Sequence, residues 1–260
     1  MTLTVPFLGM RFLNTDMAGV RKVIGLWVDK GTYGYAVTPN VDHVVSYHNK
    51  RDPELRAAYD SAALHICDSR ILTALARPSG RKLTPCPGSD LTRDLLADAL
   101  TPDVQMAVIG PSHEAVLQLQ AKYPDARITH ISSHTRLQIG SCEWQRTVQR
   151  ACDADWDILF VCLSFPKQEI FAHDLAKAGR THGFALCVGA SIDFLTGEQA
   201  RAPAAMQKAG LEWLHRLAVS PRRMWKRYLW HGPSIFALAA RQYMTDIRGL
   251  FATRNTGAAE

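Results

Sequence analysis

The feature that most constrains the fold is a repeated alternation of short apolar stretches with longer stretches of helical spacing. The apolar stretches include VPFLGMRF at 5–12, YGYAV at 33–37, VQMAVIG at 104–110 and DILFVC at 157–162. Each is followed by a segment whose apolar residues recur every three or four positions. Strands that alternate with helices form largely parallel sheets with helices on both faces. The sequence therefore predicts an α/β domain, which we expect to span residues 1–198.

The last part of the chain, residues 199–260, follows a different pattern. Helix-start signals occur at Pro203 and Pro221, and apolar residues at helical spacing continue to Phe251. Residues 201–248 contain nine Lys and Arg but only two acidic residues, a net charge of +7, whereas the whole chain carries +6. We therefore expect a basic helical appendage on the α/β core. Its charge favours an acidic partner such as nucleotide phosphates, a membrane surface or nucleic acid.

Missing signals argue against several common classes of protein. The six cysteines are widely separated, with no CxxC pair, so we expect reduced thiols and no zinc site. The absence of GxGxxG after a strand, GxxxxGK[ST], GxSxG and HExxH argues against a dinucleotide-binding enzyme, a P-loop NTPase, a serine hydrolase and a zincin. No signal-peptide pattern and no run of ~18 apolar residues is present, so we expect a cytoplasmic location.

Five polar clusters follow the predicted strands. In a doubly wound sheet, ligands bind beyond the carboxyl ends of the strands, where helix N-termini attract anions. Any single cluster could be ordinary capping or turn chemistry, but five together favour a ligand site. Because they belong to these strand-end clusters, we include among the predicted substrate-binding residues Gly110, Lys167, Glu169 and Asp193. The clusters are Thr38-Pro39-Asn40, Asp68-Ser69-Arg70, Gly110-Pro111-Ser112, Pro166-Lys167-Gln168-Glu169 and Gly189-Ala190-Ser191-Ile192-Asp193.

Several motifs together resemble the WecG/TagA/CpsF glycosyltransferases, glycosyltransferase family 26. The resemblance covers roughly residues 7 to 236, and the two blocks nearest the C-terminus are its most specific parts. The matching motifs, in chain order, are VTPNVDHVV at 37–45, HICDSRIL at 65–72, VIGPSHEAV at 108–116, DILFVCLSFPKQE at 157–169, VGASIDFLTG at 188–197, RAP at 201–203, GLEWLHR at 210–216 and PRRMWKRY at 221–228.

The resemblance implies a Rossmann-like core with an inverting, metal-independent transferase activity and no cofactor. The expected reaction moves a sugar from a UDP-sugar to a polyprenyl-diphosphate-linked saccharide at the inner face of the cell membrane, during synthesis of bacterial surface polysaccharide or exopolysaccharide. The appendage is expected to close over the active site and to bring the enzyme to the membrane. No nucleic-acid partner is expected, and the resemblance leaves a homo-oligomer open.

The resemblance also implies roles for residues of the strand-end clusters. Asp68 matches the family's proposed general base, which takes the proton of the acceptor hydroxyl as that oxygen attacks the anomeric carbon. Thr38, grouped with Asp68 as a catalytic candidate, and Asn40 match a T-x-N motif of the same pocket. Gln168 matches an amide that could hold a sugar hydroxyl or a diphosphate oxygen.

Plainer explanations exist for these and neighbouring residues. Asp68 could be a helix N-cap, and Gln168 and Glu169 could simply be polar residues of a first helical turn. Lys167 could contact the diphosphate or face solvent. His43 is expected to be a structural residue on a helix face, because no carboxylate partner is visible beside it.

Four arginines of the appendage are predicted substrate-binding residues. Arg216, Arg223 and Arg227 match arginines of the family, and Arg201 lies in the nearby RAP motif. Departure of UDP leaves negative charge on the β-phosphate, and the guanidinium fork suits phosphate oxygens. Alternatively, some of these arginines contact only lipid headgroups. The interleaved aromatic residues, such as Trp225, suit either a membrane interface or packing against the core.

Two departures from the family pattern bear on the donor. Ser69 and Ser164 stand where the family commonly has Gly, and a side chain at either position would narrow the space beside the ligand. The donor could therefore differ from the N-acetylmannosamine types, and glucose is one alternative. Rival interpretations are a non-catalytic nucleotide- or nucleic-acid-binding module, favoured by the basic C-terminal part, and an inactive scaffold relative. Confinement of the positive charge to the appendage and retention of Asp68 favour the transferase.

Overall fold

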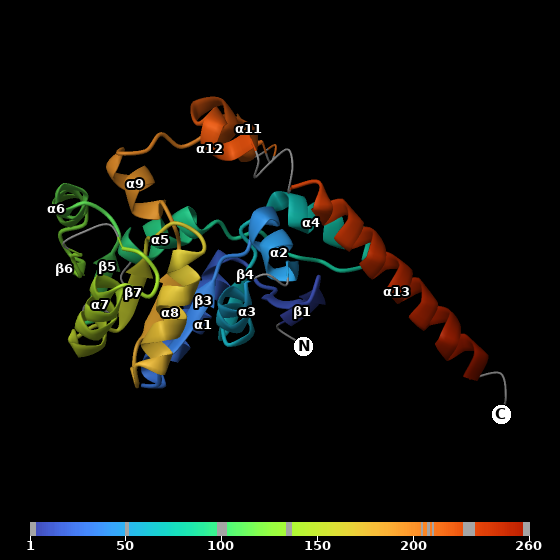
Figure 1. The fold of residues 1–260 in the computed structure, drawn as a ribbon, viewed down its shortest axis with the longest axis horizontal. Helices are drawn as coiled ribbons and strands as arrows, with labels where there is room; N and C mark the ends of the chain where they lie inside the picture. Colours follow the sequence, from blue (N-terminus) through green and yellow to red (C-terminus); the bar gives the residue numbers. More distant parts are fainter. Residues whose placement is uncertain are drawn as a thin grey trace.

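The computed structural model contains an eight-stranded sheet that is parallel except for the hairpin at one edge (Figure 1). The structure describes residues 4–49, 52–97, 103–133, 137–203, 205–206, 209, 211–225 and 232–256. The strand order is β1-β2-β4-β3-β8-β7-β5-β6. The strands are β1 Thr4–Phe7, β2 Met10–Leu13, β3 Gly34–Val37, β4 Leu64–Ile66, β5 Gln105–Ile109, β6 Arg127–His130, β7 Ile158–Val161 and β8 Phe184–Cys187.

The three central strands are buried along their whole length. All four residues of β3 (GYAV), β7 (ILFV) and β8 (FALC) are buried. A strand covered on both faces has apolar side chains at successive positions instead of alternating ones. Val37 and Val161 both lie in register with Cys187, so the carboxyl ends of these strands share one edge of the sheet.

Helices cover both faces of the sheet and bury two separate apolar clusters. One cluster includes Val44 of α2, Tyr59 of α3 and Phe171 of α8, and the other includes Ile24 of α1 and Leu95 of α5. The helices are α1 Met17–Asp29, α2 Val41–His48, α3 Pro53–Asp60, α4 Arg70–Ala76, the 3-10 helix η1 Arg77–Ser79, α5 Gly88–Ala97, α6 His113–Lys122, α7 Cys142–Asp153, α8 Lys167–Lys177, α9 Ser191–Thr196, α11 Glu212–Val219, α12 Pro221–Trp225 and α13 Ser234–Thr256.

The apolar stretch at 5–12 forms two strands instead of one. Leu8 and Gly9 both have positive φ angles, 48° and 75°. Two successive residues with positive φ form the kind of tight turn that joins antiparallel strands. The stretch therefore folds back on itself as the β1–β2 hairpin. Otherwise the predicted fold class, an α/β domain with a largely parallel sheet and a helical C-terminal segment, is confirmed.

The C-terminal helices occupy two places. α11 and α12 stand beyond α9, whereas α13 runs away from the sheet at the other side of the view (Figure 1). The start of α13 packs beside α2 and η1, with Ile235 buried and the Tyr243 hydroxyl donating to the carbonyl of Leu75. The predicted boundary at residue 198 stays a prediction. Within the described ranges, no helix combines the length and apolar character needed to cross a membrane.

Candidate active site

A cleft lies beyond the carboxyl ends of β3, β4, β7 and β8, and four of the five polar clusters contribute residues to its lining. The start of α5 and part of the C-terminal segment complete its walls. Residues from four strand ends thus reach one cavity although they are far apart in the sequence. The polar residues that line it include Thr38, Asn40, His43, Asp68, Ser164, Gln168, Arg201, Glu212 and His215.

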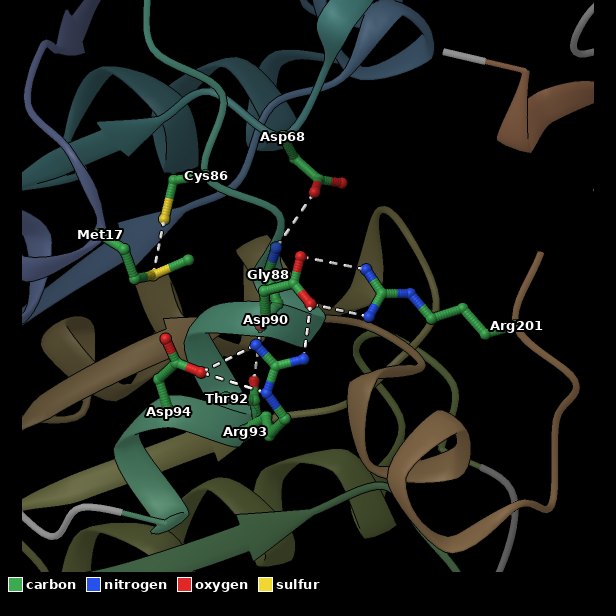
Figure 2. Close-up of polar contacts among 9 residues, drawn as sticks. All are labelled: Met17, Asp68, Cys86, Gly88, Asp90, Thr92, Arg93, Asp94 and Arg201. Atoms are coloured by element: carbon green, nitrogen blue, oxygen red, sulfur yellow. Dashed lines mark hydrogen bonds and ion pairs between the residues drawn. The ribbon is translucent and has the colours of Figure 1, made fainter. Parts of the chain in front are cut away.

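Asp68 lies just beyond β4, and the start of α5 orients its carboxylate. Oδ1 accepts the backbone N–H of Gly88 at 3.0 Å (Figure 2). Ser69, not Asp68, is the N-cap of α4, because Ser69 Oγ accepts the N–H of Leu72 at 3.3 Å. The alternative interpretation of Asp68 as the N-cap of the helix that follows it, α4, is therefore wrong. Ser69 has a capping role, and of the two serines only Ser164 is among the described residues that line the cleft.

Thr38 and Asn40 lie beyond β3, and both make hydrogen bonds that hold the strand ends together. Thr38 Oγ1 donates to the carbonyl of Cys187 at 2.7 Å, which joins the ends of β3 and β8. Asn40 is the N-cap of α2, and its Oδ1 accepts the N–H groups of Asp42 at 3.1 Å and His43 at 3.3 Å. The cap uses only Oδ1, so the Nδ2 group is the part of Asn40 that can donate to a ligand.

Gln168 and Glu169 are both buried in the first turn of α8, with 3% and 0% of their surfaces exposed. Gln168 Oε1 accepts the N–H of Gly189 at 2.7 Å, and Gln168 Nε2 donates to Glu169 Oε1 at 2.8 Å. These two bonds fix the orientation of the amide. Both residues lie in the first turn of α8, as the plainer interpretation has it, but Gln168 also lines the cleft, whereas Glu169 lies behind it.

His43 is the site residue to which the sequence pattern assigned only a structural role. Its ring stacks on Phe165 with 4.1 Å between ring centroids and 13° between planes. Nδ1 lies 3.0 Å from the Tyr59 hydroxyl and 3.7 Å from Glu169 Oε1. A carboxylate partner thus exists, although it comes from a distant part of the chain. One feature of the sequence could have identified this residue. His43 comes three residues after Asn40, the N-cap of α2, and therefore lies in the first turn of that helix, at the edge of the sheet that carries the other polar clusters.

Arg201 lines the cleft and is held by the first turn of α5. Its Nη1 and Nη2 donate to Asp90 Oδ1 at 2.8 Å and Oδ2 at 3.2 Å (Figure 2). The hydrogen bond with Asp90 raises the pKa of Arg201. Burial acts to raise the pKa of Asp90, but the hydrogen bond and charge of Arg201 outweigh it, so this pKa is lowered. Arg93 also pairs with Asp90, at 3.2 Å.

Four of the predicted substrate-binding residues are not among the described residues that line the cleft, namely Glu169, described above, and Gly110, Lys167 and Asp193. Gly110 has φ of +114°, and a Cβ there would lie 2.5 Å from the carbonyl oxygen of Cys162, so the position requires glycine for close backbone packing. Lys167 Nζ donates to the carbonyl of Leu137. Asp193 is half-buried in α9, where burial and the charge of Glu198 raise its pKa.

The C-terminal segment contributes one wall of the cleft through α11. Glu212 and His215 of that helix line the cavity. Arg216 lies in α11 and Arg223 in α12, but their side chains are outside the described part, as is the whole of Arg227. Among the described residues, no group of three or more His, Cys, Asp or Glu is placed to hold a metal ion.

An α/β sheet with a polar cleft at its carboxyl edge is the arrangement of a ligand-binding α/β enzyme. The family model described as "Glycosyl transferase WecG/TagA/CpsF family" matches residues 5–249. The match covers nearly the whole sequence, so the chain belongs to this family of glycosyltransferases, as its motifs predicted. Membership implies a nucleotide-sugar donor and a lipid-linked acceptor.

Proposed function

We propose that the protein is an inverting, metal-independent glycosyltransferase that moves a sugar from a UDP-sugar to a polyprenyl-diphosphate-linked saccharide, in the synthesis of bacterial surface polysaccharide or exopolysaccharide. The observation that carries this proposal is that Asp68 and Arg201 line the same cleft. Both are bound by the first turn of α5, one by the Gly88 N–H and the other by Asp90. A base and a cation for the leaving group are thus held by one short element.

The proposed reaction begins when Asp68 takes the proton of an acceptor hydroxyl. The oxygen attacks the anomeric carbon of the donor, and the bond from that carbon to the UDP oxygen breaks, so the configuration inverts and UDP leaves with the bonding electron pair. General-base catalysis of this kind contributes roughly 10²–10⁴-fold in rate. The hydrogen bond from Gly88 keeps the carboxylate in one orientation for the transfer.

Negative charge that develops on the leaving UDP requires cations nearby. Among the described residues that line the cleft, Arg201 is the arginine that could supply such a charge. Arg216, Arg223 and Arg227 are further candidates on the grounds of the family motifs. The helix α11, whose sequence includes Arg216, lines the cleft through Glu212 and His215. None of the proposed steps draws on a metal ion.

We further propose that the protein associates peripherally with the cytoplasmic face of the membrane, through the segment that carries the excess positive charge. Large apolar residues of that segment are exposed, among them Leu214 of α11 and Trp225 of α12. Exposed apolar side chains beside basic ones favour an anionic membrane surface. An acceptor anchored in that membrane would then meet the cleft beside α11.

The test is transfer of radiolabelled sugar from a panel of UDP-sugars to polyprenyl-diphosphate-linked saccharides, with and without EDTA. The panel contains UDP-glucose, UDP-N-acetylmannosamine and the corresponding uronic acid donors. We expect one donor to yield a lipid-linked product that EDTA does not reduce. A product that requires a divalent ion would contradict metal independence, and absence of both UDP binding and product would contradict the function itself.

A further inference from the structure

The residues that line the cleft differ in burial and in charge. Arg201 is part-exposed, with 25% of its side chain accessible, and is the only Lys or Arg among the described residues that line the cavity; we call its surroundings the rim. Thr38, His43 and Gln168 line the same cavity but are only between 3% and 4% exposed, and we call this buried part the deep end. A compact group such as a single sugar suits the deep end better than a large lipid-linked acceptor.

Behind the deep end lies a buried carboxylate. Glu169 is 0% exposed, accepts from Gln168 Nε2 at 2.8 Å and lies 3.4 Å from the Tyr59 hydroxyl. The Tyr59 hydroxyl donates its single proton to Glu169 Oε1, so its oxygen accepts from His43 Nδ1–H. This chain holds the imidazole in one tautomer, while stacking on Phe165 holds the plane of the ring.

The tautomer determines what the imidazole can offer to a ligand. With the proton on Nδ1, the neutral ring presents Nε2 as a hydrogen-bond acceptor, and a sugar hydroxyl is a suitable donor. A carboxylate has no proton to donate to this nitrogen, so the carboxylate of a uronic acid cannot make the same hydrogen bond. Arg201, which could have paired with such a carboxylate, is bound to Asp90 at the rim.

We propose that His43 is a specificity-determining residue of the cleft, which accepts a hydrogen bond from a hydroxyl of the transferred sugar and selects a neutral hexose over a uronic acid. This inference rests on the proposed function, because it takes a UDP-sugar to be the donor. It assigns the sugar to the deep end, with Gln168 and Asn40, and the diphosphate to the cationic end, with Arg201. Tyr59 and Glu169 act through His43 as positioning residues.

The experiment compares affinities for UDP and for matched UDP-sugars by calorimetry, in the full-length protein and in His43→Phe. Phenylalanine keeps an aromatic ring against Phe165 and removes both ring nitrogens. The donor pairs are UDP-glucose with UDP-glucuronic acid and UDP-N-acetylmannosamine with its uronic acid. We expect the wild-type protein to bind a neutral donor more tightly than its uronic acid. His43→Phe should weaken the neutral donor by about fivefold to tenfold, the size of one lost hydrogen bond, with UDP affinity unchanged.

Two further variants separate recognition from a general loss of structure. His48→Phe alters another histidine of α2, whose Nε2 contacts the carbonyl of Leu8 outside the cleft, and should leave both affinities unchanged. Tyr59→Phe should weaken the neutral donor in the same direction as His43→Phe, with UDP affinity unchanged.

Equal weakening of UDP and UDP-sugar in His43→Phe, an effect on the acceptor KM alone, or a wild-type preference for the uronic acid would each overturn the inference. In those cases the wild-type protein still transfers sugar, and the proposed function stands. A wild-type protein that binds neither UDP nor any donor would instead overturn the proposed function.

Discussion

Arg201 and Asp90 form a two-bonded ion pair, 2.8 and 3.2 Å long, that ties the start of the C-terminal segment to the first turn of α5. The same turn begins with Gly88, whose N–H binds the carboxylate of Asp68. A single helix start therefore holds two residues of opposite charge in one cleft (Figure 2). The relative position of the proposed base and of the proposed phosphate contact depends on this turn.

Replacing Asp90 by Asn should misplace Arg201 and lower kcat/KM by about 10-fold to 100-fold, because a hydrogen bond between charged groups is worth roughly 1.5–3 kcal/mol. Asp94→Asn is the matched control on the same helix, since Asp94 pairs with Arg93 and is not among the described lining residues. Equal rates in the two variants would contradict a positioning role for Asp90.

The Asp90–Arg201 pair should also make stability sensitive to acid. The pKa of Asp90 is lowered in the folded protein, so its contribution is fully present above the unfolded-state pKa of about 3.9 and is lost as the pH falls through the lower folded value. The difference in free energy of unfolding between wild type and Asp90→Asn should therefore shrink from pH 7 to pH 3. Urea denaturation at the two pH values measures it, and a constant difference would contradict the assignment.

Replacing Asp68 by Asn should reduce sugar transfer at least about 100-fold, because an amide cannot take the proton of the acceptor. The Asn Oδ1 can still accept the Gly88 N–H, so the fold and UDP affinity should be retained. Single-turnover transfer and UDP calorimetry check the two halves of this expectation. Transfer at the wild-type rate would remove Asp68 as the base.

Replacing Gly110 by Ala should destabilise the fold by about 3 kcal/mol or more. The position combines a φ of +114° with a Cβ that would lie 2.5 Å from the Cys162 carbonyl oxygen. Gly140→Ala is the matched control, because Gly140 has φ of +76° but open space around it, and should cost only about 1 kcal/mol. Urea denaturation at neutral pH compares them, and equal losses would contradict the packing explanation.

Replacing Leu214 by Ser should weaken binding to vesicles that contain anionic lipid. Leu214 is 43% exposed on α11, and burying part of a leucine side chain in lipid contributes about 1–2 kcal/mol, or roughly fivefold to thirtyfold in affinity. Leu117→Ser, at a leucine 50% exposed on α6, controls for apolar surface elsewhere. Vesicle co-sedimentation at two salt concentrations is the measurement. Loss of binding in both variants alike would argue against a specific membrane face.

Residues at the strand ends could be predicted from the sequence. Thr38, Asp68 and Gln168 each follow a different apolar stretch, and carboxyl ends of parallel strands lie at one edge, so their convergence does not depend on details of side-chain packing. The sequence could not show which of the neighbouring residues Lys167 and Gln168 has its side chain in the cleft. Neighbouring residues of a helix point about 100° apart, and here the first contacts Leu137 while the second lines the cleft.

The sequence by itself determined the succession of strands and helices, the edge of the sheet that carries the polar clusters, and the family. Hydrophobic period, caps and turn residues act within a few positions of one another, so they can be recognised locally. Only the tertiary structure decided which distant residues meet. Glu169 reaches His43 because α8 packs beside α3, which in turn packs beside α2. Arg201 reaches Asp90 because the C-terminal segment passes the start of α5. Such contacts arise from the packing of whole helices on the sheet, which a local pattern does not specify.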